Sequence, residues 1–167
     1  MIIAKFLYQL LKKEPAPYYY DYSIKTILSK PIRKFFTNVV APNCVSNKVR
    51  ILIYRACGFK IGNNVFIGMH CYLDDMCYDL ITIGNNVTIS YGVYFACHGK
   101  NQGHYPIRIE DEAYIGMRAS LISKNVDGNE NGIVIGKKAI IGSNCLVNKN
   151  IPAEKTAVGI PCRIIGD

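Results

Sequence analysis

The sequence predicts a mainly β protein: a parallel β-helix of about four 18-residue turns, preceded by a short helical N-terminal segment. A six-residue pattern, in which an aliphatic residue is often followed by Gly, recurs throughout the body of the chain. Groups of three such sixes begin at residues 61, 83, 109 and 135, with gaps of 22, 26 and 26 residues. These gaps equal 18 plus 4, 8 and 8, so short insertions fall at the same corner of successive turns. A sandwich of short strands would instead show irregular spacing.

Each six is expected to form a short strand with one inward aliphatic side chain, stacked on its counterpart a turn away. A single turn cannot bury its inner face, so at least about three turns are needed for stability. Aliphatic or aromatic residues two positions before each turn start extend the strands backwards: Phe59, Ile81, Ile107 and Ile133. Glycines are expected to allow tight corners in conformations closed to larger residues: Gly62, Gly68, Gly84, Gly116, Gly136 and Gly142.

The segment before the repeats has apolar positions at helical spacing. It predicts helices over 2–13 and 23–40, joined by the link EPAPYYYDY, and a third helix over 47–57 that Gly58 ends. The expected division is a helical, basic segment (1–58) that caps the β-helix, the β-helix itself (59–152) and a C-terminal tail (153–167).

Composition and charge narrow the class of protein. Half of the 167 residues are apolar and 19% are charged, which predicts a buried core and excludes global disorder. Residues 1–60 hold 11 Lys/Arg and two Asp/Glu, a net charge of +9. Residues 61–167 hold 9 Lys/Arg and 10 Asp/Glu, a net charge of −1, so the whole chain carries +8. Such a basic arm suits phosphate, anionic lipid or an acidic partner. No nucleic-acid module accompanies it, so no nucleic-acid partner is expected.

Location and redox state follow from what the chain lacks. No apolar run approaches the roughly 20 residues of a transmembrane helix, and no cleavage site follows the apolar start. We expect a cytoplasmic protein. The pattern over 2–13 suits either packing on its own oligomer or peripheral contact with the inner membrane face. The seven cysteines contain no CxxC pair, which predicts reduced, mostly buried thiols.

His98 is the strongest candidate for a catalytic residue. It lies at the end of the second turn, just before the first eight-residue insertion, where a side chain can project from a rigid scaffold. Imidazole titrates near neutral pH, so it can take a proton from an attacking hydroxyl and then deliver it to a leaving group. The adjacent Cys97 is expected to face the opposite side of the strand, which argues against a thiolate nucleophile.

The repeats, His98 with the following Pro106, Ile107 and Ile109, and the ending IGSNCLVNKNIPAEKTAVGIPCRIIG resemble the hexapeptide-repeat acyltransferases. The resemblance covers roughly residues 48–167 and is greatest to sugar and polysaccharide O-acetyltransferases of the galactoside, maltose, capsule and colanic acid types. It implies a left-handed β-helix, a homotrimer with active sites between subunits, acetyl-CoA as donor, and His98 as general base.

The resemblance also assigns binding residues. Lys149 and Arg163 match basic residues near the nucleotide phosphates, and Asn148 stands where Thr is usual. Positions that line the pantetheine arm are matched by Gly116, Met117 and Ser143. Gly166 replaces a second Arg that is often present, and Tyr114 replaces a frequent Trp. The resemblance also implies acceptor contacts from Asp74 and Asp75. His104 lies in the insertion, six residues after His98, where it is expected to be exposed or to contact the acceptor.

The sequence therefore predicts an acetyl-CoA-dependent O-acetyltransferase that acts on a hydroxyl of a saccharide or glycan precursor of capsule, O-antigen or exopolysaccharide type. No metal is expected. Three alternatives stay open: an amino-sugar N-acetyltransferase, a γ-carbonic-anhydrase-like metalloenzyme with His70, His98 and His104 as ligands, and a non-catalytic β-helical scaffold. The group that orients His98 is also open, with Asp74, Asp75 and a backbone carbonyl as candidates.

Overall fold

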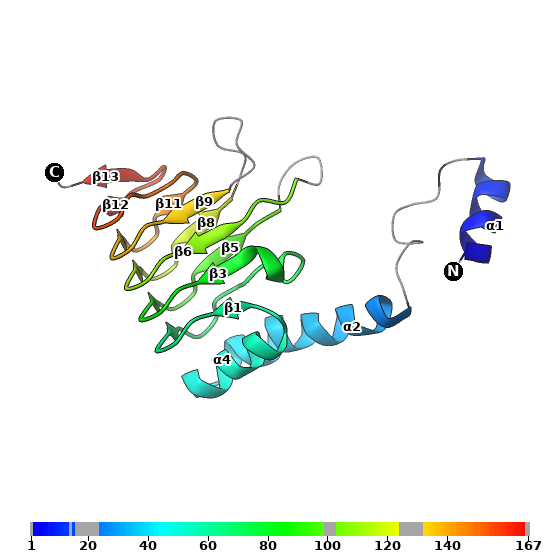
Figure 1. Ribbon diagram of the computed structural model, residues 1–167, viewed down its shortest axis with the longest axis horizontal. Coiled ribbons are helices and arrows are strands. Elements are labelled where there is room, and N and C mark those ends of the chain that lie inside the picture. The colour runs from blue at the N-terminus through cyan, green and yellow to red at the C-terminus, as the bar shows by residue number, and fades with distance from the viewer. Residues whose placement is uncertain (1, 14, 16–23, 99–102, 124–131, 166–167) are drawn as a thin grey trace. The chain divides into compact units, whose positions relative to one another are not determined.

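The computed structural model describes residues 2–13, 15, 24–98, 103–123 and 132–165 (Figure 1). They belong to two compact units, Met1–Lys34 and Phe35–Asp167. The first unit contains α1 (Ile2–Lys12) and most of α2 (Ile24–Phe35), as predicted. Apart from Pro15, the link between them lies outside the described residues. None of the helices within the described ranges is long and apolar enough to cross a bilayer.

Three sheets form the faces of a parallel β-helix (Figure 1). The first contains β1 (Lys60–Ile61), β3 (Ile81–Ile83), β6 (Ile107–Ile109) and β9 (Ile133–Ile135). The second contains β2 (Phe66–Ile67), β4 (Thr88–Ile89), β7 (Tyr114–Ile115), β10 (Ile140–Ile141), β12 (Thr156–Val158) and the antiparallel β13 (Arg163–Ile165). The third contains β5 (Tyr94–Ala96), β8 (Ser120–Ile122) and β11 (Leu146–Val147).

The pairing register matches the repeat spacing. Ile61 pairs with Ile83, Ile83 with Ile109, and Ile109 with Ile135, which are the first residues of the predicted turns. The inward residues form columns of almost completely buried aliphatic side chains, such as Ile67, Ile89, Ile115 and Ile141. Burial of each such side chain contributes about 1.5–3 kcal/mol, so the stacked columns are the main source of stability.

The role predicted for the repeat glycines is wrong in one respect. They do not have positive φ; the left-handed corner positions are held mostly by other residues, including Asn64, Asn86, Arg118 and Asn144. The glycines instead provide space, because neighbouring coils approach closely there. A Cβ on Gly136 would lie 2.4 Å from the backbone nitrogen of Ala153.

Helical segments close one end of the β-helix. After α2 the chain continues as η2 (Phe36–Val40), α3 (Ala41–Asn43) and α4 (Asn47–Ala56), and Gly58 follows with φ +102°. The side-chain amide of Asn47 forms two hydrogen bonds with the edge of β2. It donates to the Val65 carbonyl and accepts from the Ile67 N–H, each at 3.0 Å. Buried Arg50 donates to the carbonyls of Ala41, Cys44 and Ile67. The bonds to Val65 and Ile67 satisfy backbone groups that would otherwise form an open sheet edge, and the bonds to Ala41 and Cys44 tie the helical segment to it.

Five of the seven free cysteines are buried, as the sequence predicts, whereas Cys44 and Cys57 are half-buried. A short helical turn, η3 (Tyr78–Leu80), fills the first insertion, between the third face of one coil and β3 of the next. It begins three residues after Asp75, so the Asp74–Asp75 pair lies just before this insertion.

Candidate active site

His98 projects outward from the segment that follows β5. Phe95 and Cys97 point into the core, so the alternating Tyr94 and His98 lie on the outer face. The chain then returns alongside itself: the Tyr105 N–H donates to the Cys97 carbonyl at 2.8 Å, and His104 forms an antiparallel bridge with His98. The backbones of the two histidines thus lie side by side, and the His104 side chain is exposed.

The Asp74 carboxylate orients the His98 ring. Its Oδ2 lies 2.5 Å from His98 Nδ1 and also accepts the Cys97 N–H at 2.9 Å, while Oδ1 accepts the Met76 N–H at 3.1 Å. Asp74 is 0% exposed, whereas the His98 side chain is 41% exposed. An ionised carboxylate only accepts hydrogen bonds, so Nδ1 carries the hydrogen and Nε2 keeps a lone pair for a proton.

Of the three orienting groups that the sequence leaves open, the structure selects Asp74. The expected contact of Asp74 with an acceptor does not fit this position, because its side chain is buried beneath His98 and both oxygens already accept hydrogen bonds. Asp75, the other half of the pair, is half-buried, and its Oδ1 accepts from the Asn38 amide at 3.0 Å. Asn38 lies in η2, 37 residues away, and no motif in the sequence marks it.

Two buried thiols lie close to the Asp74 carboxylate. Burial, together with the negative charge of Asp74, raises the pKa of Cys77 to about 12. Burial, with the nearby Cys77 and Asp74, also raises the pKa of Cys97 well above its usual range. Both thiols therefore stay protonated at neutral pH, which fits the prediction that Cys97 is not a nucleophile.

The residues predicted to bind the donor lie on later coils. Met117 and Ser143 are exposed at the same corner of neighbouring coils, where the Asn144 N–H donates to the Met117 carbonyl at 2.8 Å. The coils touch closely here, because a Cβ on Gly116 would lie 2.6 Å from the Gly142 carbonyl carbon. Of the other predicted donor residues, Asn148 is half-buried, whereas Lys149 and Arg163 of β13 are exposed.

Within the described part of the chain, the three histidines are not gathered into one cluster. The described parts of the chain hold no group of three or more His, Cys, Asp or Glu side chains that could bind a metal ion. His70 sits at a left-handed corner with φ 56°, and its ring packs edge-on against Tyr91 with a centroid distance of 5.2 Å. This arrangement gives His70 a packing role on the first coil.

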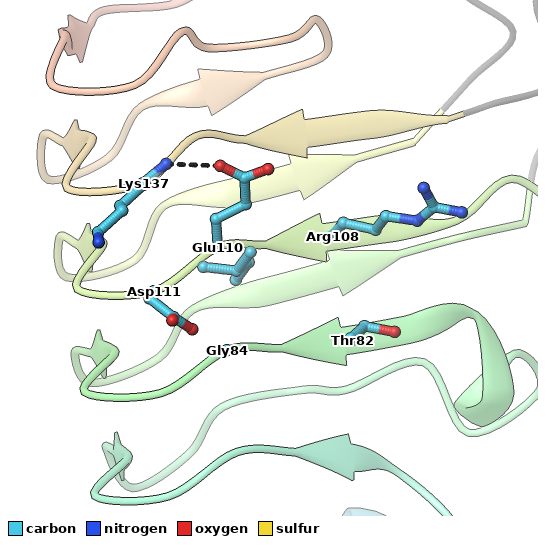
Figure 2. A pocket seen from close by; sticks show the side chains of 7 residues that line it. Thr82, Gly84, Arg108, Glu110, Asp111 and Lys137 are labelled. Carbon is cyan, nitrogen blue, oxygen red and sulfur yellow. Dashed lines mark hydrogen bonds between the residues drawn. The ribbon is translucent and has the colours of Figure 1, made fainter.

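A hollow of about 410 Å³ lies on a different face of the β-helix. It is lined by residues of β3, β6 and the corners beside them, and Figure 2 shows Thr82, Arg108 and Lys137 around it. Glu110 accepts the backbone N–H of Lys137 at 2.8 Å, so part of the lining is fixed by hydrogen bonds. None of its lining residues belongs to the His98–Asp74 pair. We place the candidate active site at that pair, because the chemically competent groups meet there.

The stacked sixes define the class of the protein, a parallel β-helix of hexapeptide repeats. A family model described as "Hexapeptide repeat of succinyl-transferase" matches residues 58–95 and 106–149. The chain belongs to the hexapeptide-repeat acetyltransferase family, whose fold is a left-handed parallel β-helix.

Similar proteins fall within that family. A serine acetyltransferase from Bacillus licheniformis is 36% identical over 110 residues, 65% of this chain and 45% of that protein. The galactoside O-acetyltransferase of Escherichia coli is 30% identical over 124 residues, 64% of this chain and 56% of that protein. This chain therefore spans about half the length of the curated relatives that it matches. A hexapeptide-repeat acetyltransferase from Vibrio cholerae, solved with acetyl coenzyme A, has TM-score 0.60 at 20% identity and covers 86% of this chain and 90% of that one.

Proposed function

We propose that this protein is an acetyl-CoA-dependent O-acetyltransferase that transfers acetyl to a hydroxyl of a saccharide or glycan precursor. The observation that carries the proposal is the pairing of exposed His98 with buried Asp74. Such a pair presents a correctly oriented base to solvent without a metal ion. The E. coli relative, a galactoside O-acetyltransferase, supports a sugar hydroxyl as acceptor.

The reaction follows from the geometry of the pair. His98 Nε2 removes the proton from the acceptor hydroxyl while that oxygen attacks the carbonyl carbon of the thioester. The imidazolium that forms is stabilised by the Asp74 carboxylate at Nδ1. As the tetrahedral intermediate collapses, the C–S bond breaks and Nε2 returns the proton to the departing thiolate. The products are an acetyl ester and free coenzyme A.

The donor site follows from the family and from exposed residues of the later coils. In the proposal Lys149 and Arg163 bind the nucleotide phosphates, aided by Asn148. The pantetheine arm runs beside Met117 and Ser143, near Gly116. We further propose a homotrimer with active sites between adjacent β-helices, because His98 lies on an open outer face that a second subunit would complete. His104 would then reach the acceptor from the loop side.

A serine-type acceptor is the second candidate. The B. licheniformis relative at 36% identity is a serine acetyltransferase, and attack by a serine hydroxyl needs the same base. The two candidates are separated by the acceptor alone. Acetyl transfer to L-serine but to no sugar would favour the second.

We also propose a peripheral membrane contact through the basic N-terminal segment of a cytoplasmic protein. Residues 22–73 contain no Asp or Glu, and α4 and the residues before it expose Val45, Val49 and Leu52 beside Lys48. Anionic lipid attracts such a surface. Co-sedimentation with phosphatidylglycerol vesicles, but not with phosphatidylcholine vesicles, is the expected result. If the protein bound neither kind of vesicle, the proposed membrane contact would be refuted.

Calorimetric titration with acetyl-CoA tests the donor half without a guess at the acceptor. Saturable binding near one site per chain is expected. It should weaken in Lys149→Ala/Arg163→Ala, while Lys60→Ala/Arg108→Ala, which removes two exposed cations of the first sheet, should bind normally. His98→Ala should bind the donor normally but lower turnover by roughly 100-fold or more. Absence of binding at millimolar acetyl-CoA would refute the acetyltransferase proposal.

A further inference from the structure

Two tyrosines, Tyr72 and Tyr94, form a stacked aromatic surface on the coils that precede His98. Tyr72 and Tyr94 pair across neighbouring coils, with ring centroids 4.7 Å apart and an angle of 16° between the ring planes. Tyr94 is 41% exposed although it is part of a regular strand. The next position of the same outward column is the small Ser120, which pairs with Tyr94 in β8. No large side chain therefore extends this stack on the third coil.

The Tyr72 ring is held in place by a chain of polar contacts. The Tyr72 side chain lies close to the Asp75 carboxylate, and Asp75 Oδ1 accepts from the Asn38 amide at 3.0 Å. Burial, with the charges of Asp74 and Asp75, raises the pKa of Tyr72 far above its usual range, so the phenol keeps its hydrogen at any working pH. The helical segment thus fixes the first ring, and the first ring supports the second. A surface fixed in this way loses little freedom on binding.

The aromatic surface lies on the same outer face as the base. Tyr94 and His98 are four residues apart on one extended segment, a distance of about 13 Å at roughly 3.3 Å per residue. Between them lies Ala96, whose small side chain leaves the intervening outward position open. A hydroxyl at His98 and an apolar ring face at Tyr94 therefore require an acceptor longer than a single sugar.

We propose that Tyr94, supported by Tyr72, binds a second sugar ring of the acceptor while the first presents its hydroxyl to His98. The acceptor is then a glycan of at least two linked sugars. This inference rests on the proposed function. It gives Asp75 and Asn38 positioning roles, because the Asp75 carboxylate that Asn38 holds lies close to the Tyr72 side chain. Aromatic faces suit the C–H face of a sugar ring, which is flat and apolar.

The experiment compares matched acceptors with acetyl-CoA as donor: glucose with maltose, and galactose with lactose. For the wild-type protein we expect the disaccharide of at least one pair to have a KM about tenfold lower than its monosaccharide, the effect of one good stacking contact. Tyr94→Ala should abolish this difference and leave kcat and the monosaccharide KM unchanged. Tyr94→Phe should retain it. The matched control is Tyr91→Ala, which removes an equally exposed tyrosine that packs on His70.

Each other outcome is decisive. An unchanged disaccharide preference in Tyr94→Ala would refute the proposed role of Tyr94 and leave the proposed function intact. The protein could instead bind acetyl-CoA and transfer acetyl to L-serine, or accept no sugar. Either result would refute the role of Tyr94 and the saccharide acceptor but not the donor site. Failure of the wild-type protein to bind acetyl-CoA would refute the proposed function itself. Intact melting temperatures would show that the variants fold.

Discussion

Replacement of Asp74 by Asn removes the charge behind His98 while keeping the shape of the side chain. Three donors converge on the two carboxylate oxygens: the Met76 N–H, the Cys97 N–H and His98 Nδ1. A hydrogen bond to an ionised group contributes about 1.5–3 kcal/mol, against about 1 kcal/mol for a neutral one. Loss of the charge should therefore withdraw about 1–2 kcal/mol from the imidazolium, equal to roughly 5- to 30-fold in rate.

The amide has a second effect on the proton position. Whenever its NH2 group faces Nδ1, the ring favours the tautomer with hydrogen on Nε2, which cannot accept a proton. We therefore expect kcat of Asp74→Asn to fall by about 10- to 100-fold in total, measured as release of free coenzyme A with the best acceptor. Binding of acetyl-CoA should not change. Asp79→Asn, which neutralises an exposed carboxylate of η3, is the matched control. Wild-type kcat in a folded Asp74→Asn protein would refute the orienting role of Asp74.

Three further predictions concern stability, measured by chemical denaturation. Gly136→Ala should lower the free energy of unfolding by about 2–4 kcal/mol, because its Cβ would meet the Ala153 backbone. Gly92→Asn should lower it by less than about 1 kcal/mol, because Asn144 holds the equivalent left-handed corner. Arg50→Met should cost about 3 kcal/mol or more, because three carbonyls lose their donor; an unchanged midpoint would contradict this. Burial raises the pKa of Cys77 to about 12 and, with Cys162 nearby, that of Cys145 to about 11, so above pH 9 the unfolded chain loses these protons first. The free energy of unfolding should then fall by up to about 1.4 kcal/mol per thiol and pH unit, and a flat profile from pH 9 to 10.5 would exclude this linkage.

Most of the fold could be predicted from spacing because each coil repeats one physical requirement, an inward aliphatic residue over its counterpart. Ile61, Ile83, Ile109 and Ile135 pair as the spacing predicts for this reason. The role of the glycines was not predictable in the same way. Periodicity places a small residue at a position, but only the distance between coils shows whether it is needed for conformation or for space.

The candidate site was predictable where a side chain stands next to a repeat boundary, as His98 does. The different roles of Asp74 and Asp75 were not predictable, because the two residues are adjacent and only their partners in the folded chain distinguish them: His98 and two backbone N–H groups for Asp74, and Asn38 for Asp75. Asn38 was out of reach for another reason. Its contact with Asp75 joins a helical segment to a coil across 37 residues, and no periodic pattern connects them.

The two ends of the β-helix have a consequence for growth of the sheets. Every parallel coil is a template for one more, so an uncapped stack could elongate by adding segments from other molecules, as amyloid does. Here Asn47 and Arg50 occupy the bonding groups of β2 at one end, and β13 folds back antiparallel on β12 at the other. These terminators are independent of the coils between them. Insertion of a complete 18-residue coil in the middle should therefore lengthen the protein without exposing a new template.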